Sequence, residues 1–493
     1  RAGRGGPPLV RRLCDELRRE GVRYCQFKSN WRLERWLAGE GDLDLLVERA
    51  DAGRFACALH RLGFKQARPT EDRVVPGVCD YYGFDEEAGR FVHLHVHHQL
   101  VLGHDLTKNF RLPVERAYLD SASREGLMPV PAAEFELILF VLRMVLKYAP
   151  AESGLRRLAG GKDSPGDSLR AELKFLEARA SRAGVERLLR EHLPFVGVEF
   201  FGECLRSIAG ACPAWRRLWL RVSLERRLCA HARRGLLADA LVRAGRRARR
   251  LLTERAAGRP ARKRLTAGGA LVALVGGDGA GKTTAVDGLH GWLSKKFAVR
   301  RFHLGKPPRS PLTLAVIVAL RLTGQTGAAV PPGEGREPRG AGGDAFPGYL
   351  RLLRWVLASR DRRRLYARAR RFATNGGVAL CDRFPVERLR LMDGPNIART
   401  VVPARRNRLV RLMLEIEERN YRQIMEPDLL FVLRVDPEVA VGRKTIESEH
   451  HVRSRSRELW EQDWTGTRAR VVDAGRPAPE VLAELQSVVW RNL

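Results

Sequence analysis

The chain has no long hydrophobic segment. Its longest apolar run, Leu312–Leu320, lies between Pro311 and Arg321 and is well short of the roughly 20 residues that a helix needs to cross a bilayer. We therefore expect no membrane span. We interpret the run itself as a short buried helix.

The sequence also lacks paired cysteines. It contains eight cysteines, and no two of them form a CxxC pair. This spacing is typical neither of a zinc knuckle nor of a disulfide framework. It favours a reducing compartment, so we expect a cytoplasmic protein.

Acidic residues are too few to balance the basic ones. Lysine and arginine total 89 against 57 aspartates and glutamates, which gives a formal net charge of +32. An anionic partner such as nucleic acid is one explanation, and an arginine-rich solvated surface is the other. The basic residues are spread through all segments, which favours the surface. The basic tract 226–265 lacks the aromatic residues that stack on bases, so we interpret it as a charged helix and linker.

With 493 residues the chain is too long for one ordinary core. Phe135, Leu139, Leu142 and Leu146 recur at helical spacing, whereas the first block mixes short apolar runs with helical patterns. The predicted divisions are an α+β domain at 1–130, a helical region at 131–225, a basic helix and linker at 226–267 and an α/β domain at 268–493. A Gly/Pro-rich insertion, Thr323–Asp344, interrupts the last domain and is typical of a surface loop.

A phosphate-binding loop opens the α/β domain. Ala270–Val275 is a continuous apolar run typical of a buried strand, and a helical pattern covers Ala285–Phe297. Between them the chain matches G-x-x-x-x-G-K-[ST] in the required strand–loop–helix context. The expected nucleotide-binding residues are Gly276, Gly277, Gly279, Ala280, Gly281, Lys282, Thr283 and Thr284.

The chemistry of this loop predicts ATP and Mg²⁺ as cofactors. Glycines let backbone N–H groups converge on phosphates at a helix N-terminus. Lys282 would neutralise the β- and γ-phosphate oxygens, and the Thr283 hydroxyl would bind Mg²⁺.

Two later segments supply further charged residues. Val378–Asp382 is a second apolar strand pattern, in which Asp382 would organise Mg²⁺ and the following Arg383 would hold an acceptor phosphate. A third strand pattern, Leu429–Val435, leads to Arg443 and then to the arginines of 453–457. Arginines in a closing segment can stabilise charge that develops during phosphoryl transfer.

From about residue 268 to its end the sequence resembles thymidylate kinases. The similar segments are Gly276–Thr284, Asp361-Arg362, Gly377–Phe384, Pro427–Glu438 and Val471–Ala474. The resemblance implies a P-loop kinase fold with a core, an acceptor region and an arginine-bearing lid. It also implies a small-molecule nucleotide substrate, a nucleoside monophosphate with dTMP as the first candidate.

The resemblance assigns roles by motif position. Asp278 would lie near the transferred phosphoryl group, and Arg362 and Arg383 would address the acceptor. Arg443 with Arg455 would belong to the lid, and Arg443 is also an expected nucleotide-binding residue. The implied catalytic set is Asp278, Lys282, Arg383 and Arg455. The implied substrate-binding set is Arg362, Asp382 and Arg383.

The acceptor side departs from the family pattern. An Arg-Glu-Pro-Gly-Gly type loop is usual after the second strand, whereas this chain has His303–Pro308. Two alternatives therefore stay open. One is a kinase and nucleotidyltransferase fusion that acts on a sugar or other metabolite, and the other is a nucleic-acid-binding P-loop protein without kinase activity. A homodimer is also left open.

Two carboxylates stand out in the first block. Asp42 and Asp44 alternate within Gly41–Val47, which places both on one face of a strand, where they could hold Mg²⁺. With Lys28-Ser29 upstream, this block resembles the minimal nucleotidyltransferase superfamily. That family usually has a third carboxylate on a neighbouring strand, where this chain has His93.

The histidines of 93–98 form a pattern of their own. His93, His95 and His97 alternate, so they share one strand face. They are interpreted either as a transition-metal site beside Asp42 and Asp44 or as hydrogen-bonded structural residues.

The length, the helical pattern and the two resemblances together predict a multidomain protein. It would combine a C-terminal α/β P-loop kinase fold with a parallel sheet, an N-terminal α+β nucleotidyltransferase-like domain and a helical middle region.

Overall fold

The computed structural model consists of two compact units, 1–261 and 262–493, which we call unit 1 and unit 2. The division between them falls inside the predicted linker 226–267. The structure describes residues 8–37, 40–70, 73–123, 125–147, 165–210, 212–257, 262–323, 346–386, 389, 394–443 and 449–493. The predicted surface loop at 323–344 lies, from residue 324 onward, outside the described residues.

Unit 1 contains a mixed sheet. Its strands are β1 (Tyr24–Gln26), β2 (Asp42–Val47), β3 (Lys65–Arg68), β4 (Val78–Asp85) and β5 (Arg90–His97), with a small hairpin of β6 (Leu100–Leu102) and β7 (Phe110–Leu112). Their order is β1-β2-β5-β4-β3, in which β2 and β5 are parallel and the other pairs antiparallel. Apolar residues of α1 and α3 join those of the sheet in one buried cluster.

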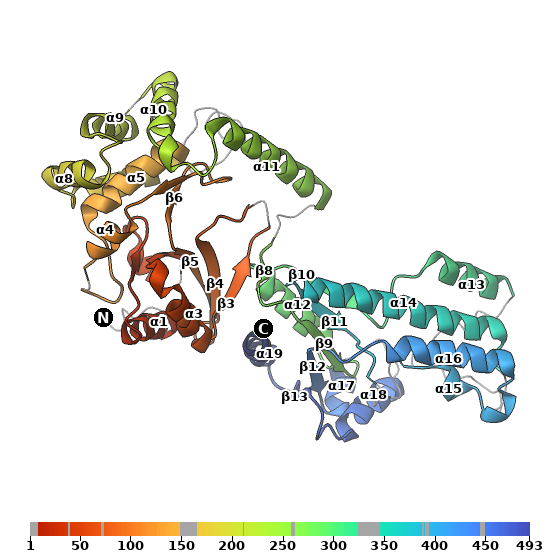
Figure 1. Ribbon diagram of the computed structural model, residues 1–493. Helices are drawn as coiled ribbons and strands as arrows, with labels where there is room; N and C mark the ends of the chain where they lie inside the picture. The colour runs from red at the N-terminus through yellow and green to blue at the C-terminus, as the bar shows by residue number, and fades with distance from the viewer. Residues whose placement is uncertain are drawn as a thin grey trace. The chain divides into compact units, whose positions relative to one another are not determined.

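The described helices of unit 1 are α1 (Pro8–Arg19), α2 (Leu33–Leu37), α3 (Ala52–Arg61), α4 (Glu115–Asp120), α5 (Ala133–Lys147), α7 (Pro165–Glu177), α8 (Arg182–His192), α9 (Val198–Ala209), α10 (Ala214–Arg227) and α11 (Leu236–Ala257). A second core is formed mainly by α4, α5 and α7 to α10. Helix α5 confirms the predicted helical spacing and is buried around most of its circumference, with α7 to α10 packed against it (Figure 1). Much of the basic tract forms α11.

Unit 2 is built on a parallel sheet. The strands of this sheet are β9 (Leu271–Gly276), β10 (Val299–His303), β11 (Val378–Asp382), β12 (Leu429–Arg434) and β13 (Ala469–Asp473), and the two-residue strand β8 (Arg264–Leu265) lies outside it. The described helices of unit 2 are α12 (Lys282–Leu293), α13 (Pro311–Leu322), α14 (Tyr349–Thr374), α15 (Ile397–Thr400), α16 (Arg408–Arg422), α17 (Pro437–Arg443), α18 (Glu449–Glu461) and α19 (Ala478–Asn492). The sheet order is β10-β11-β9-β12-β13.

The central position of β9 explains its sequence. Every residue of this strand is buried, which fits a near-continuous apolar run in a parallel sheet covered on both faces. The chain passes to one side of β9 for β10 and β11 and to the other side for β12 and β13. The carboxyl end of β9 is therefore a topological switch point, where open α/β sheets bind their ligands.

One expectation about burial was wrong. The apolar run at 312–320 does form a helix, α13, but only Thr313 and Leu320 of that helix are buried. Leu312, Leu314 and Val318 are each about half exposed. Among the described elements its main contact is with α14, so an apolar composition here did not produce a core helix.

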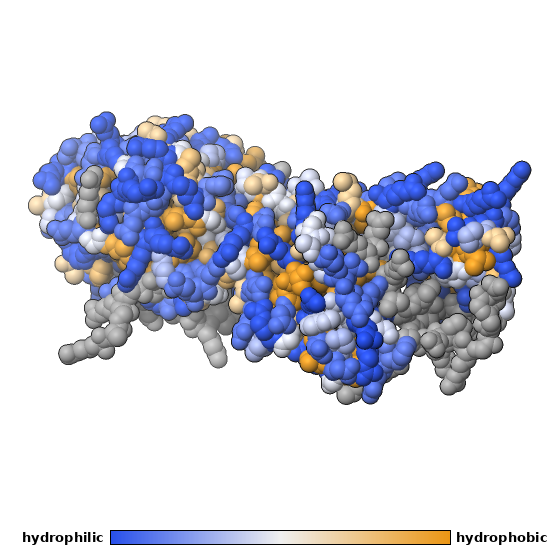
Figure 2. Space-filling model, turned by 90° about the horizontal axis from the view of Figure 1, so that it is seen from below, coloured by the Kyte–Doolittle hydropathy of each residue, from blue (hydrophilic) through white to orange (hydrophobic). Residues whose placement is uncertain are grey.

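The face of the molecule drawn in Figure 2 is mostly polar. Hydrophilic residues cover most of the described surface of each unit in Figure 2, with smaller apolar areas among them. Within the described ranges, no helix is both long enough and apolar enough to cross a membrane.

The eight cysteines are all free thiols, as their spacing predicts, and all lie in described parts of the chain. Cys57 and Cys229 are exposed, whereas Cys381 is buried within β11. Burial raises the pKa of the Cys381 thiol well above its ordinary value.

Candidate functional site

The P-loop connects β9 to α12, which confirms the predicted strand–loop–helix arrangement. Gly279 and Gly281 have φ angles of 83° and 76°, a region that residues with a Cβ rarely adopt. A Cβ on Gly279 would also lie 2.6 Å from the backbone oxygen of Ala440. The loop is therefore held close to α17, and glycine is required at this point.

Lys282 lies at the start of α12 and is buried. Its Nζ atom donates to the backbone oxygens of Gly276 at 2.9 Å and Gly277 at 2.7 Å. The next two residues, Thr283 and Thr284, are exposed at the helix N-terminus. These two residues are therefore accessible at a helix N-terminus, the end of a helix that favours anions.

Asp278 brings three parts of unit 2 together. Its carboxylate lies 2.6 Å from the Arg455 guanidinium of α18, 3.2 Å from Arg383 after β11, and 4.0 Å from Lys282 Nζ. Burial raises the pKa of Asp278, but the hydrogen bond from Arg455 and the three positive charges outweigh burial. The pKa of this carboxyl is thus lowered, and the group is ionised at neutral pH.

Asp382 ends β11, where it is the register partner of Leu274 in β9. Its Oδ1 atom is buried and has no hydrogen-bond partner among the described residues. An unpaired buried carboxylate oxygen is costly unless a cation or ordered water satisfies it. Oxygen ligands from Asp382 and Thr283 fit the preference of Mg²⁺.

Arg383 follows Asp382 with a φ angle of 55°. A left-handed conformation is unusual for a residue with a long side chain, and such strain is concentrated at functional sites. Its side chain is one-quarter exposed and reaches Asp278. The backbone conformation therefore turns this guanidinium toward the P-loop.

Arg362 and its neighbour Asp361 are buried in α14. The Arg362 side chain donates to the backbone oxygens of Leu304 at 2.7 Å and Gly305 at 3.3 Å. Asp361 accepts from the backbone N–H of Ser310 at 2.9 Å. The pair thus fixes both ends of the segment 304–310. This segment includes most of the loop His303–Pro308, which differs from the usual loop of thymidylate kinases.

The arginines expected in a lid have different surroundings. Arg443 donates to the backbone oxygens of Ala474 at 2.9 Å and Gly475 at 3.3 Å, just after β13. Arg453 pairs with Glu438 at the surface. Arg455 of the same helix instead reaches the carboxylate of Asp278 in the P-loop, at 2.6 Å. Lys444 lies outside the described residues.

Helix α18 also packs directly on the P-loop. A Cβ on Gly277 would lie 2.5 Å from Ser456 Oγ and 3.1 Å from Ser456 Cα. The Ser456 hydroxyl is buried without a hydrogen-bond partner in the described part of the chain. Sequence reasoning missed Ser456, because its contact depends on how α18 crosses the loop.

In unit 1, Asp42 and Asp44 lie on one face of β2, as their alternation predicts. Their register partners on β5 are His93 and His95. His93 contacts Asp42 at 2.6 Å and Asp80 of β4 at 2.8 Å. An imidazole therefore lies between two carboxylates. Asp80 was missed because it comes from β4, where its direct register partner is His95, and it reaches His93 diagonally across the strand pair.

Asp44 is the more deeply buried of the two aspartates. It is ion-paired with Lys28, and its Oδ1 atom lies 2.8 Å from His95 Nδ1. Burial raises the pKa of Asp44, but Lys28 and the imidazoles of His95 and His97 outweigh burial and hold the pKa well below its usual range. Burial lowers the pKa of His97 to about 3, so this imidazole is neutral.

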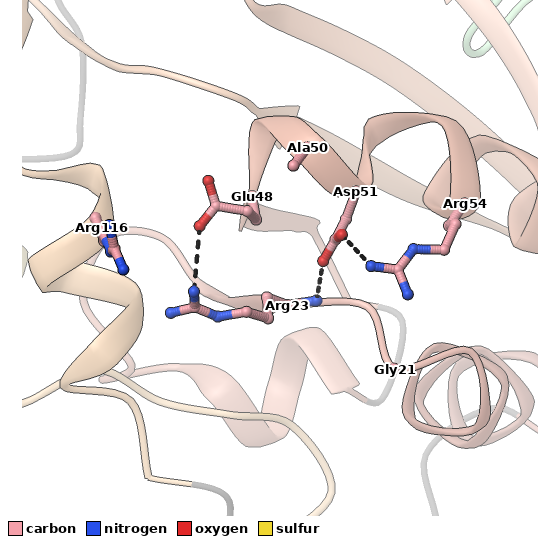
Figure 3. A pocket seen from close by; sticks show the side chains of 7 residues that line it. All are labelled: Gly21, Arg23, Glu48, Ala50, Asp51, Arg54 and Arg116. Carbon is pink, nitrogen blue, oxygen red and sulfur yellow. Dashed lines mark hydrogen bonds and ion pairs between the residues drawn. The ribbon is translucent and has the colours of Figure 1, made fainter.

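A separate cavity of about 350 Å³ lies elsewhere in unit 1 (Figure 3). Its carboxylates are already paired: Asp51 accepts from the Arg23 backbone and the Arg54 guanidinium, and Glu48 lies 3.5 Å from Arg23. This cavity offers no uncompensated acid or base, so we assign no chemistry to it.

Two proteins that share one name, from two strains of Escherichia coli, are similar to part of this chain. The chain is 25% identical over 231 residues to "Uncharacterized ATP-binding protein YghR" of Escherichia coli strain K12. The same identity and length hold for the protein of that name from Escherichia coli O6:H1 strain CFT073. Each match covers 44% of this chain and 86% of the other protein. No protein-family model matches the chain.

Proposed function

We propose that unit 2 binds ATP with Mg²⁺ and transfers the γ-phosphoryl group to a phosphorylated acceptor. A nucleoside monophosphate is the proposed acceptor class, with dTMP the first candidate. The observation that carries this proposal is the convergence on Asp278 of three cations from different elements: Lys282, Arg383 and Arg455. Positive groups around a P-loop are suited to the spreading negative charge of phosphoryl transfer.

The donor side rests on the geometry of the loop and on the relative. Lys282 can exchange the carbonyls of Gly276 and Gly277 for β- and γ-phosphate oxygens. The exposed Thr283 hydroxyl and Asp382 would hold Mg²⁺, which neutralises charge on the phosphates when bound. The similarity to a protein named as ATP-binding supports the same nucleotide here.

Asp278 has a distinct part in this proposal. In the structure its carboxylate holds Arg383 and Arg455 at one point beside the P-loop. When phosphates enter, the two guanidinium groups can turn to the transferred group without moving far. Asp278 thereby positions the arginines and keeps their charge partly compensated until the substrate binds.

The acceptor is tested by measuring ADP release from ATP and Mg²⁺ by the full chain. Candidate acceptors are dTMP, other nucleoside monophosphates, sugar phosphates and free sugars. We expect turnover with a nucleoside monophosphate. Turnover only with a free sugar would contradict the acceptor class while leaving ATP use intact, and the absence of turnover with every acceptor would contradict the kinase proposal.

Replacing Arg383 by glycine separates its chemical role from its structural one. Glycine adopts the left-handed φ at no steric cost, so Arg383→Gly is expected to change stability by no more than about 1 kcal/mol. Loss of the guanidinium should lower kcat by about 10²–10³-fold. Thermal melting and steady-state kinetics measure the two effects, and Arg383→Lys should recover part of the rate. Full activity of the glycine variant would exclude Arg383 from phosphoryl transfer.

A further inference from the structure

A second set of ligand-type atoms lies in unit 1, outside the proposed kinase site. Asp44, His95 and His97 direct three atoms to one point on the sheet. The Asp44 Oδ1 atom lies 2.8 Å from His95 Nδ1 and 3.8 Å from His97 Nε2, and the two nitrogens are 3.2 Å apart. These contacts make a small triangle of one oxygen and two nitrogens.

The size of this triangle is that of one face of a metal coordination tetrahedron. Metal–nitrogen and metal–oxygen bonds of about 2.0–2.2 Å imply ligand atoms roughly 3.3 Å apart. The three observed separations lie on either side of that value. An ion could therefore bind all three atoms with shifts of about half an ångström.

We infer that Asp44, His95 and His97 form a binding site for a divalent transition-metal ion of the zinc type. Two imidazole nitrogens and one carboxylate oxygen suit zinc, cobalt or nickel, whereas Mg²⁺ prefers oxygen ligands alone. Three protein ligands leave a fourth position for water or a ligand oxygen. The inference is independent of the kinase proposal and differs in ion class from a magnesium site at Asp42 and Asp44.

The ligands are held by the sheet and by their neighbours. Asp44 and His95 are register partners in adjacent parallel strands, and His97 lies two residues further along β5 on the same face. The ring of Phe27 contacts that of His97, with 4.4 Å between centroids. Positions fixed by regular structure and packing are those in which a metal site keeps its geometry.

His93 shares the strand face but does not belong to the set. Its two nitrogens contact Asp42 and Asp80, and its ring stacks on Tyr82 with 4.3 Å between centroids. Those contacts hold it away from Asp44. The structure therefore divides the three alternating histidines into one that bridges carboxylates and two that face a common point.

The ammonium group of Lys28 would compete with a metal ion for Asp44. This ammonium group is ion-paired with the same Oδ1 atom of Asp44 that would bind the metal. The Lys28 side chain is 30% exposed, so it can move into solvent when a divalent ion takes its place. Removing this ammonium should therefore strengthen metal binding rather than weaken it.

The test uses the full chain after treatment with a chelator, titrated with Co²⁺ and followed by its visible absorption. We expect one equivalent to bind with a four-coordinate spectrum and to be displaced by Zn²⁺ but not by excess Mg²⁺. His97→Ala should weaken binding by more than the roughly 10–100-fold that loss of an outer-shell partner costs. Lys28→Met should tighten it severalfold, a gain that misfolding cannot produce. His93→Gln is the matched histidine control and should leave the affinity unchanged.

Three results would overturn the inference. One is the absence of stoichiometric Co²⁺ or Zn²⁺ binding by both the unaltered chain and Lys28→Met. Another is binding that persists in a folded His97→Ala variant. The third is displacement of Co²⁺ by Mg²⁺, which would assign the site to oxygen ligands around Asp42 and Asp44 instead.

Discussion

Lys282→Ala is expected to lower ATP turnover at least about 10³-fold while the chain stays folded. The side chain is buried, and its Nζ atom donates to the backbone oxygens of Gly276 and Gly277. Its removal takes away the ammonium nearest the proposed phosphate position, and water can satisfy the freed carbonyls. Steady-state ADP release and thermal melting of the full chain measure the two effects.

The matched control for this change is Lys295→Ala. Lys295 is an exposed lysine just beyond the end of α12, the helix that Lys282 begins. The Lys295→Ala variant should keep both its ATP turnover and its stability. A loss of turnover in this variant would show that reduced positive charge alone, rather than the position of Lys282, causes the effect. Turnover that persists in Lys282→Ala would refute the assignment of the P-loop as the ATP site, whatever the acceptor proves to be.

Glu136→Gln should abolish a large pH dependence in the stability of unit 1. Burial raises the pKa of Glu136 to about 7, against the opposing effects of Arg179 and the Asn30 backbone. Because the folded-state pKa is raised, the stabilising contribution is fully present below about pH 4.5 and is lost as pH rises through 7. The rise in the pKa of Glu136 from 4.5 to about 7 corresponds to about 3 kcal/mol in the free energy of unfolding.

Urea titrations between about pH 5 and pH 8 test this expectation, with deuterium uptake by α5 peptides identifying the transition of unit 1. The unaltered chain should lose stability as pH rises, and Glu136→Gln should be nearly flat. Glu134→Gln is the control, since the pKa of Glu134 is lowered rather than raised. A pH dependence that survives in Glu136→Gln would place its origin in another group.

Glu136 matters for the inferred metal site as well as for stability. Its Oε1 atom accepts from the backbone N–H of Asn30 at 2.8 Å, two residues after Lys28. Lys28 has a positive φ of 78°, so its direction depends on how this short segment is held. A change at Glu136 is thus expected to alter metal affinity indirectly through Lys28.

The sequence predicted best those features that depend on neighbouring residues. The strand–loop–helix arrangement around Gly276–Thr284 needs only a buried strand, glycines and a helix start in order, so this arrangement was confirmed. The predicted strand 378–382 matches β11 residue for residue. The alternation of Asp42 with Asp44 and of His93 with His95 also gave the correct faces, because a strand fixes side-chain direction with a period of two.

Contacts between distant elements could not be obtained in this way. The meeting of Asp278 with Arg455 joins residues 177 positions apart, and arginines are too common in this chain for composition to single one out. Asp80 lies beside His93 only through the register of β4 and β5. The exposure of α13 was also missed, since hydrophobicity alone does not show whether a neighbouring element covers a helix.

The positions of the cysteines determine where thiol-reactive labels can attach to the folded chain. The two exposed cysteines, Cys57 and Cys229, both belong to unit 1, whereas Cys381, the cysteine of unit 2, is buried with a raised pKa. Maleimide dyes attack the thiolate form of accessible cysteines. Under native conditions, fluorescent labels would therefore attach to unit 1 alone, and reaction at Cys381 would signal that the central sheet of unit 2 has opened.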